Sequence, residues 1–185
     1  GDVKFEDLRR LKYLDMCQKE TLRLQPPARG IGKVALRDGH LGKFRIKEGT
    51  RFLIPFMAVQ RSTKVWGPDA EKFVPERWEK GAPHPFAYLP FSTGPRGCIG
   101  MEFSLVEQKV ALVKLLQRFC LRQPKNEPEL ELESKLFVGP VDFKLQVFDR
   151  PGFDSAPKVN RRASVDTMAS EQSPTMTWQV APTHA

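Results

Sequence analysis

The stretch that decides the fold of this chain is Phe91-Ser92-Thr93-Gly94-Pro95-Arg96-Gly97-Cys98-Ile99-Gly100, which runs directly into a helical pattern. Three glycines within seven residues let the backbone curve tightly and approach a bound group closely. Cys98 comes just before the helix, where free N–H groups and the positive end of the helix dipole favour a thiolate. A thiolate is a good ligand for a soft metal, and Arg96 offers a cation to an anionic group on the same ligand. The loop therefore suits a ligand with a metal at its centre and carboxylates at its rim.

Other interpretations of this loop fit less well. A phosphate-binding P-loop would end in Gly-Lys-Ser or Gly-Lys-Thr, which is absent here, and a cysteine phosphatase places its arginine after the cysteine rather than before it. A buried structural cysteine is the simplest interpretation of Cys17 and Cys120, but it does not explain the glycine and arginine spacing around Cys98. A zinc site would need further Cys or His nearby, and the three histidines are scattered: His40, His84 and His184.

A second constellation combines Glu20-Thr21-Leu22-Arg23 with the downstream segment Pro75-Glu76-Arg77-Trp78. Glu20 and Arg23 stand about one helical turn apart, so they can form an ion pair. They continue a face that begins with Tyr13 and Met16, which predicts that the pair is buried. A buried pair needs further donors to offset its desolvation, and Arg77 is the candidate for a third member.

The hydrophobic pattern along the rest of the sequence predicts two long helices. Between them lie a region of strands and then a proline-rich region. The first helix is expected to be continuous and capped by Asp7, and the second is apolar around most of its circumference, so we expect it to be buried. The stretch between residues 66 and 95 is rich in proline and aromatics and should be held by side-chain packing. The predicted elements are helices at 5–24 and 101–119 and strands within 33–59, 130–138 and 143–148.

The 185 residues suit one domain with a tail: 40% are hydrophobic and the formal net charge is +8. We expect residues 1–150 to form the domain and residues 151–185, rich in Ser, Thr, Pro and Ala, to be a disordered tail. The aromatics are not interleaved with Lys and Arg, which disfavours a nucleic-acid partner. No apolar run approaches the roughly 20 residues of a membrane span, and no signal peptide is visible.

Taken together, these residues resemble those of a cytochrome P450. The sequence Phe91-x-x-Gly94-x-Arg96-x-Cys98-x-Gly100 matches the family's haem-binding loop at every defining position. Glu20-x-x-Arg23 resembles the motif of its K helix, and the segment 75–78 resembles the one that completes a buried triad. The resemblance covers residues 3–148 and, through residues 66–70, points to the eukaryotic microsomal type. It implies the C-terminal portion of a mainly α fold with small β-sheets.

The resemblance also implies site residues and a cofactor, haem b. Cys98 would be the axial thiolate of the haem iron, which pushes electron density toward O–O cleavage. Arg96 would bind a haem propionate, and Phe91 would pack beside the sulfur. Lys33 stands near a position where many members carry another propionate-binding arginine. Gly94 and Gly100 would shape the loop. Glu20, Arg23 and Arg77 would form a structural triad behind the haem.

By the same resemblance, electrons would come from NADPH through a cytochrome P450 reductase, and one atom of O2 would enter a lipophilic substrate such as a lipid or sterol. Residues 28–31 and 136–138 resemble substrate-lining regions. Arg118, Arg122 and Lys125 are candidates for the reductase-binding surface. The parent protein would lie on the cytosolic face of the endoplasmic reticulum membrane.

Several family features are absent from the sequence. The long helix with an acid–Thr pair that delivers protons to bound oxygen, the helix over the other haem face and the N-terminal anchor are not present, so no catalytic residue is assigned. A chain that begins at Gly1 in a helical pattern is expected to be a fragment of a monooxygenase, and the alternative is a non-catalytic truncated form or pseudoenzyme. Arg161-Arg162-Ala163-Ser164 resembles a kinase site, with phosphorylation at Ser164 as a hypothesis.

Overall fold

A computed structural model of the chain describes residues 3–124, 132–134, 138–140 and 144–151. Five α-helices and two 3-10 helices alternate with short strands along these residues. The helices are α1 (Phe5–Leu8), α2 (Lys12–Leu24), α3 (Phe56–Gln60), α4 (Thr63–Trp66), η1 (Pro75–Glu79), η2 (Gly94–Arg96) and α5 (Met101–Arg118). The strands are β1 (Ile31–Val34), β2 (Gly39–Leu41), β3 (Phe44–Ile46), β4 (Arg51–Ile54), β5 (Phe119–Arg122), β6 (Leu132–Ser134), β7 (Val138–Pro140) and β8 (Gln146–Asp149).

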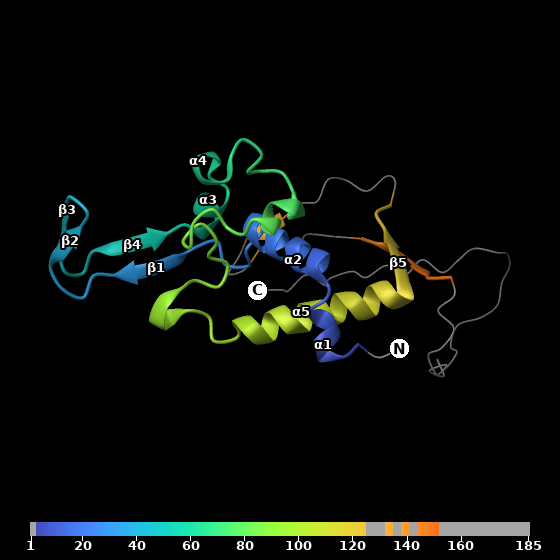
Figure 1. The fold of residues 1–185 in the computed structure, drawn as a ribbon. Helices are drawn as coiled ribbons and strands as arrows, with labels where there is room; N and C mark the ends of the chain where they lie inside the picture. Colours follow the sequence, from blue (N-terminus) through green and yellow to red (C-terminus); the bar gives the residue numbers. More distant parts are fainter. Residues whose placement is uncertain (1–2, 125–131, 135–137, 141–143, 152–185) are drawn as a thin grey trace, which may run out of the picture.

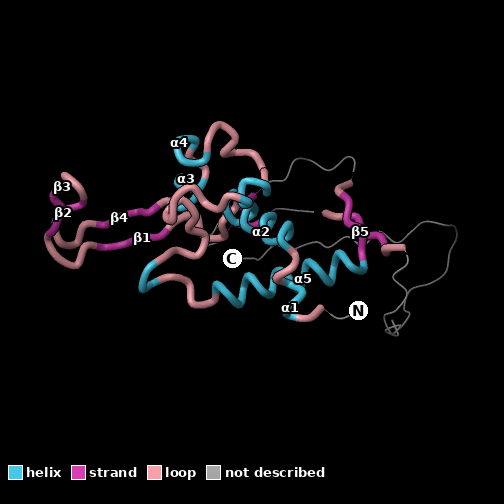
Figure 2. Tube along the Cα trace, viewed as in Figure 1, coloured by secondary structure: helices cyan, strands magenta, loops and turns pink. Residues whose placement is uncertain are grey.

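The strands pair only two at a time, and every described pair is antiparallel: β1 with β4, β2 with β3, β5 with β8 and β6 with β7. The β1–β4 ribbon leaves the helices and ends in the β2–β3 hairpin, whereas β5 follows the far end of α5 (Figures 1 and 2). The expected class, mainly α with small sheets, is confirmed. The helices, not the sheets, therefore form the body of the described structure.

The core lies where α2 packs against the segment that contains η1. Its buried members are Trp66, Ala70, Trp78 and Ala87, with Tyr88 packed against them. The rings of Trp66 and Trp78 are 5.5 Å apart, and those of Trp78 and Tyr88 are 4.7 Å apart in an edge-on arrangement. Residues 66–95 contain no strand, so the expectation that side-chain packing holds this stretch is confirmed.

The prediction of one continuous helix over residues 5–24 is wrong. The helix breaks between Leu8 and Lys12, where the packing changes: α1 packs on α5, whereas α2 packs mainly on η1 and meets α5 through Gln18. Asp7 does not precede the helix as a cap. It lies within α1, where its carboxylate accepts a hydrogen bond from the Lys4 amide at 3.2 Å.

Two further predictions need correction. Residues 56–60 form α3 rather than a strand, because Phe56 and Gln60, one helical turn apart, are both buried on the same side.

The second long helix, α5, is not buried: none of its residues reaches the interior, and Phe103 is 74% exposed. Among the described residues, the contacts of α5 include those with α1, α2, β5 and Arg150, which are too few to cover an apolar helix on every side. Phe119 begins β5 instead of ending the helix.

Some expectations fall outside the described residues. These are the disordered tail with Ser164, the substrate-lining residues Leu136 and Phe137, and Lys125. Within the part of the chain that is described, none of the helices combines the length and apolar character that crossing a bilayer requires.

Candidate functional site

The Phe91–Gly100 loop is closed by its own backbone. The amide of Cys98 donates to the carbonyl of Phe91 at 2.9 Å, and the amide of Gly97 donates to the carbonyl of Gly94 at the same distance. Ser92 and Gly94 adopt left-handed backbone angles, with φ of 62° and 75°. Only glycine adopts this conformation at little cost, which gives Gly94 its role in shaping the loop. The closure places the backbone of Cys98 beside that of Phe91, three residues before α5 begins.

The loop forms one wall of a cavity of about 390 Å³. The opposite wall comes from the segment between α2 and β1 and from the first residue of α3. Most of the lining side chains are apolar, which suits a flat hydrophobic ligand. The lining residues are Pro27, Ala28, Gly30, Ile31, Phe56, Pro90, Phe91, Ser92, Arg96 and Cys98.

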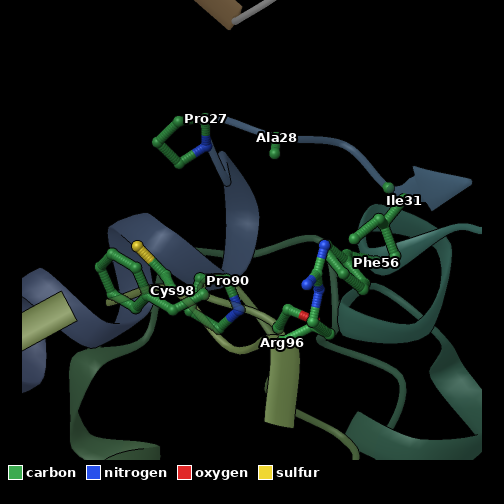
Figure 3. A pocket seen from close by; sticks show the side chains of 10 residues that line it. Pro27, Ala28, Ile31, Phe56, Pro90, Arg96 and Cys98 are labelled. Carbon is green, nitrogen blue, oxygen red and sulfur yellow. The ribbon is translucent and has the colours of Figure 1, made fainter. Parts of the chain in front are cut away.

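Cys98 and Arg96 approach the cavity from two sides. Figure 3 shows the sulfur of Cys98 turned toward the side of Pro27, while the guanidinium of Arg96 rises beside Ile31 and Phe56. Cys98 is an exposed free cysteine, so its thiol is accessible to a ligand. Arg96 is the cation of the lining set. The geometry thus separates a soft ligand atom from a positive charge across an apolar floor.

Not all of the other residues predicted from the sequence line the cavity. Gly100 directly precedes α5, with Cys98 Sγ 4.0 Å from where its Cβ would be, and it does not line the cavity. Lys33 lies on β1 opposite Phe52 and is also outside the lining. Of the predicted substrate-lining residues, Ala28, Gly30 and Ile31 do line the cavity.

The donor set of the cavity fits a haem. Among the described residues no three His, Cys, Asp or Glu side chains gather to hold a metal ion. A metal bound by Cys98 must therefore bring its own remaining ligands, as a macrocycle does. The exposed thiol fits the axial position, the apolar lining fits the ring, and Arg96 fits a carboxylate at the rim.

Behind the cavity, the carboxylate of Glu20 is fully buried and accepts five hydrogen bonds. Arg23 donates from Nε to Oε2 at 2.8 Å and from Nη2 to Oε1 at 2.9 Å. Arg77 Nε and the amide of Val74 donate to Oε1, and Trp78 Nε1 donates to Oε2, each at 2.9 Å. Burial alone would raise the pKa of Glu20, but these hydrogen bonds, that of Arg23 foremost, lower it to about 2. Glu20 is thus a permanent anion at ordinary pH.

The two arginines extend this centre outward. Arg23 is fully buried and donates to the carbonyls of Gln60 at 2.8 Å and Ala70 at 2.6 Å. Arg77 also contacts Asp69, with 3.1 Å between Nη2 and Oδ2. The structure therefore brings Glu20, Arg23 and Arg77 together, and it uses them to tie α2, α3 and η1 to one another.

Sequence reasoning missed Gln60, which links this centre to the cavity loop. Its side chain is fully buried, and Oε1 accepts a hydrogen bond from the amide of Leu89 at 2.6 Å. Its Nε2 donates to the carbonyls of Leu22 and Arg23 at 3.2 and 3.0 Å. Leu89 immediately precedes the cavity residues Pro90 and Phe91. No spacing rule marks a lone glutamine, so the sequence contained no signal that could have identified it.

The chain is matched over residues 1–147 by the family model described as cytochrome P450. It belongs to this family, and membership supports a haem-thiolate monooxygenase in general terms. The fold agrees: a crystal structure of the cytochrome P450DA heme domain superimposes with a TM-score of 0.73 at 30% identity, covering 81% of this chain and 33% of that one.

Sequence relatives lead to the same family in distant organisms. Cytochrome P450 3A13 of Mus musculus is 42% identical over 132 residues, which is 70% of this chain and 26% of the relative. Cytochrome P450 714C2 of Oryza sativa subsp. japonica is 44% identical over 128 residues, covering 67% of this chain and 24% of the relative. The chain therefore spans about a quarter of the length of the curated relatives it matches.

Proposed function

We propose that this chain is the haem-binding part of a haem-thiolate monooxygenase, with Cys98 as the axial ligand. The observation that carries the proposal is the pairing of an exposed thiol with Arg96 in one apolar cavity. Arg96 would bind a propionate, Phe91 would pack beside the sulfur, and the closed loop would fix the position of Cys98. When bound, haem supplies the activation of dioxygen.

The Glu20 centre has a supporting role in this proposal. Glu20, Arg23 and Arg77 do not line the cavity. They hold α2, α3 and η1, whose neighbouring segments form the cavity walls. Because each buried charge of the centre has several partners, its geometry resists change. No residue of this chain is assigned to proton delivery or to any other catalytic step.

The finer parts of the proposal concern the whole protein. The substrate is lipophilic, as the resemblance of residues 28–31 to a substrate-lining region implies, and a lipid or sterol is the class we favour. Electrons come from NADPH through a cytochrome P450 reductase or a similar donor. Two candidates for the docking surface are described: Arg118 ends α5, at the opposite end of that helix from Cys98, and Arg122 ends the following strand β5. The parent protein lies on the cytosolic face of the endoplasmic reticulum membrane.

A haem titration of the purified chain tests the proposal. We expect the carbon monoxide difference spectrum of a thiolate-ligated haem, and its loss in Cys98→Ala. Cys120→Ala is the matched control, because Cys120 is a free cysteine on β5, beyond the far end of α5. Arg96→Leu should keep the thiolate spectrum and weaken haem binding about tenfold or more. An unchanged spectrum in Cys98→Ala would contradict the proposal.

A second candidate function is a non-catalytic fragment or pseudoenzyme. The same titration separates the two, since a folded chain that binds no haem supports the second candidate. A chain that binds haem through Cys98 but turns over no substrate with a reductase supports it as well, in its pseudoenzyme form.

A further inference from the structure

The side chain of Gln60 is hydrogen bonded to the two segments that lead into opposite walls of the cavity. Its Nε2 donates to the carbonyls of Leu22 and Arg23, in the last turn of α2, at 3.2 and 3.0 Å. Its Oε1 accepts a hydrogen bond from the amide of Leu89 at 2.6 Å. A glutamine amide has two donor hydrogens and one acceptor oxygen. One side chain therefore connects the end of α2 to Leu89 and uses all of its polar groups to do so.

Arg61, the next residue, holds the same end of α2. Its Nε and Nη2 donate to the carbonyl of Leu24 at 3.0 and 2.6 Å, and its Nη1 pairs with Glu71 at 2.7 Å. The last carbonyls of a helix have no partner within that helix, so Gln60 and Arg61 satisfy the carbonyls that α2 leaves open. The first residue of this cavity wall, Pro27, follows Leu24 by three positions.

The connection from Gln60 to the other wall is shorter. Leu89 directly precedes Pro90 and Phe91, which line the cavity. The carbonyl of Phe91 accepts a hydrogen bond from the amide of Cys98 at 2.9 Å, so two residues and one hydrogen bond separate Leu89 from Cys98. Figure 3 shows Pro27 on the opposite side of the cavity from Pro90 and Cys98.

We propose that Gln60 is a positioning residue that sets the distance between the two walls, and thereby the position of Cys98 relative to the opposite wall. Gln60 is fully buried, and a buried donor or acceptor that loses its partner is costly. Separation of the walls by about 1 Å would break at least one of its hydrogen bonds. The relevance to haem rests on the proposed function, but the spacing itself does not require haem to be bound.

The distance between the walls can be measured in the haem-free 185-residue chain. Arg29, within the first wall, and Ile99, beside Cys98, are both exposed and suit labelling. Nitroxide labels are attached to Arg29→Cys and Ile99→Cys after the three native cysteines are replaced by serine. Electron paramagnetic resonance then gives the distribution of distances between the labels.

Gln60→Met is the first variant, because methionine has a similar length but no amide. We expect the distance distribution to become at least about twofold broader, since neither wall is then held by the side chain. A glutamine that only stabilised the core would change the free energy of unfolding and leave this distribution unchanged in the folded chain. An unchanged distribution in folded Gln60→Met would therefore overturn the inference.

Gln60→Asn tests whether the length of the side chain matters. It keeps the same polar groups on a side chain that is one methylene shorter. It cannot reach Leu89 and the end of α2 together, so the distribution should broaden as it does in Gln60→Met. A distribution equal to that of the unmodified chain would show that the length of Gln60 does not set the spacing.

Arg61→Met keeps the inference testable if the variants at Gln60 do not fold. The side chain of Arg61 is 21% exposed, so the fold should tolerate its loss better. This variant releases only the carbonyl of Leu24, and we expect the distribution to broaden about 1.5-fold. An unchanged distribution here, with both Gln60 variants unfolded, would overturn the inference.

Leu8→Ala is the matched control for lost stability. Leu8 is 5% exposed in α1, which packs on α5, and it does not line the cavity. The variant should lower the free energy of unfolding, measured in urea, and leave the distance distribution unchanged. Equal broadening in Leu8→Ala and Gln60→Met would assign the effect to lost stability and would overturn the inference.

A second readout uses haem and the native cysteines. At equal amounts of bound haem, Gln60→Met and Gln60→Asn should give at most about one third of the thiolate carbon monoxide spectrum of the unmodified chain. Leu8→Ala should give all of it, and a full thiolate spectrum in both Gln60 variants would contradict the positioning of Cys98. Absence of the spectrum in the unmodified chain would instead contradict the proposed function, and the label distances would still decide whether Gln60 sets the spacing.

Discussion

Arg23 binds Glu20 through two parallel hydrogen bonds of 2.8 and 2.9 Å, and neither side chain has any exposed surface. Bidentate pairing of this kind is stronger and more directional than a single contact. A buried ion pair by itself is weak support for stability, because desolvation of both ions offsets their attraction. Here three further donors reach Glu20 and three backbone carbonyls reach Arg23, so the pair organises the segments that carry the cavity.

Replacing Glu20 with glutamine should therefore destabilise the chain strongly. Glu20→Gln leaves the buried Arg23 without its counter-ion, and loss of one partner of a buried pair costs about 3–5 kcal/mol. Urea unfolding followed by circular dichroism measures the change. Glu79→Gln, at an exposed position at the end of η1, is the control and should change stability by less than about 0.5 kcal/mol. Equal stability of the two variants would show that the pair is energetically unimportant.

The same carboxylate should make stability depend on acid. The pKa of Glu20 is lowered from 4.5 to about 2 in the folded chain, so the unfolded state binds its proton first as the pH falls. Its contribution is complete above about pH 5 and is lost progressively toward about pH 2, by up to about 3 kcal/mol. Denaturation at a series of pH values measures this slope. In Glu20→Gln the slope over this range should be shallower, and an unchanged slope would assign the acid sensitivity to other carboxyls.

Gln60, which is fully buried, and Gln25, which is partly buried, allow a matched test of the link between Gln60 and the loop. Gln60→Leu removes the acceptor for the Leu89 amide and two donated hydrogen bonds, at a cost of about 1–3 kcal/mol for each buried group left unsatisfied. Gln25→Leu should be neutral or stabilising, because Gln25 Oε1 is buried and finds no donor among the described residues. Urea unfolding gives both values, and hydrogen exchange at Leu89 should accelerate in Gln60→Leu alone. A cost at Gln25 equal to that at Gln60 would contradict this account.

Gly30 and Gly32, which flank the cavity residue Ile31, should differ sharply in their tolerance of alanine. A Cβ on Gly30 would lie 2.6 Å from the carbonyl oxygen of Ile54, which is backbone and cannot turn aside. Gly30→Ala should thus separate β1 from β4 at the cavity wall and cost about 1–3 kcal/mol. A Cβ on Gly32 meets nothing within 4 Å, so Gly32→Ala should be neutral or stabilise by up to about 1 kcal/mol. Thermal unfolding distinguishes them, and an equal effect would refute the packing argument.

What the sequence predicted well was local in the chain. Arg96 and Cys98 line the same cavity because both belong to one ten-residue loop. Glu20 and Arg23 form a pair because they are three residues apart on a helix. The hydrogen bonds of Trp78 to Glu20 and of Leu89 to Gln60 join residues 58 and 29 positions apart, and such contacts leave no periodic pattern. The position of Arg77 was suggested by resemblance, not by spacing.

The errors have a similar cause. Residues 5–24 carry a continuous helical pattern, yet the helix breaks between α1, which packs on α5, and α2, which packs mainly on η1, because tertiary packing overrides propensity. The sequence of α5 is apolar on all sides, which predicts that the helix is covered. It does not predict which part of the protein covers it. Burial depends on partners from other segments, and the residues of a single helix do not encode them.

The two tyrosines of the chain provide a final prediction, because no other tyrosine obscures their titration. The charge of Glu76, whose carboxylate accepts a hydrogen bond from Tyr13 at 3.3 Å, raises the pKa of Tyr13 above its usual value. Burial, with smaller effects from the charges of Asp15 and Glu20, raises the pKa of Tyr88 much further. Absorbance of tyrosinate should therefore rise in two steps, first for Tyr13 and then for Tyr88.

Ionisation of Tyr88 should also destabilise the fold. Since a tyrosine in the unfolded chain ionises at about pH 10, the stability that neutral Tyr88 provides is complete below that pH and is lost above it. The second step should thus coincide with unfolding measured by circular dichroism, and Glu76→Gln should lower only the first. Ionisation of both tyrosines in one step near pH 10, in a chain that stays folded, would contradict the burial of Tyr88 beside Trp78.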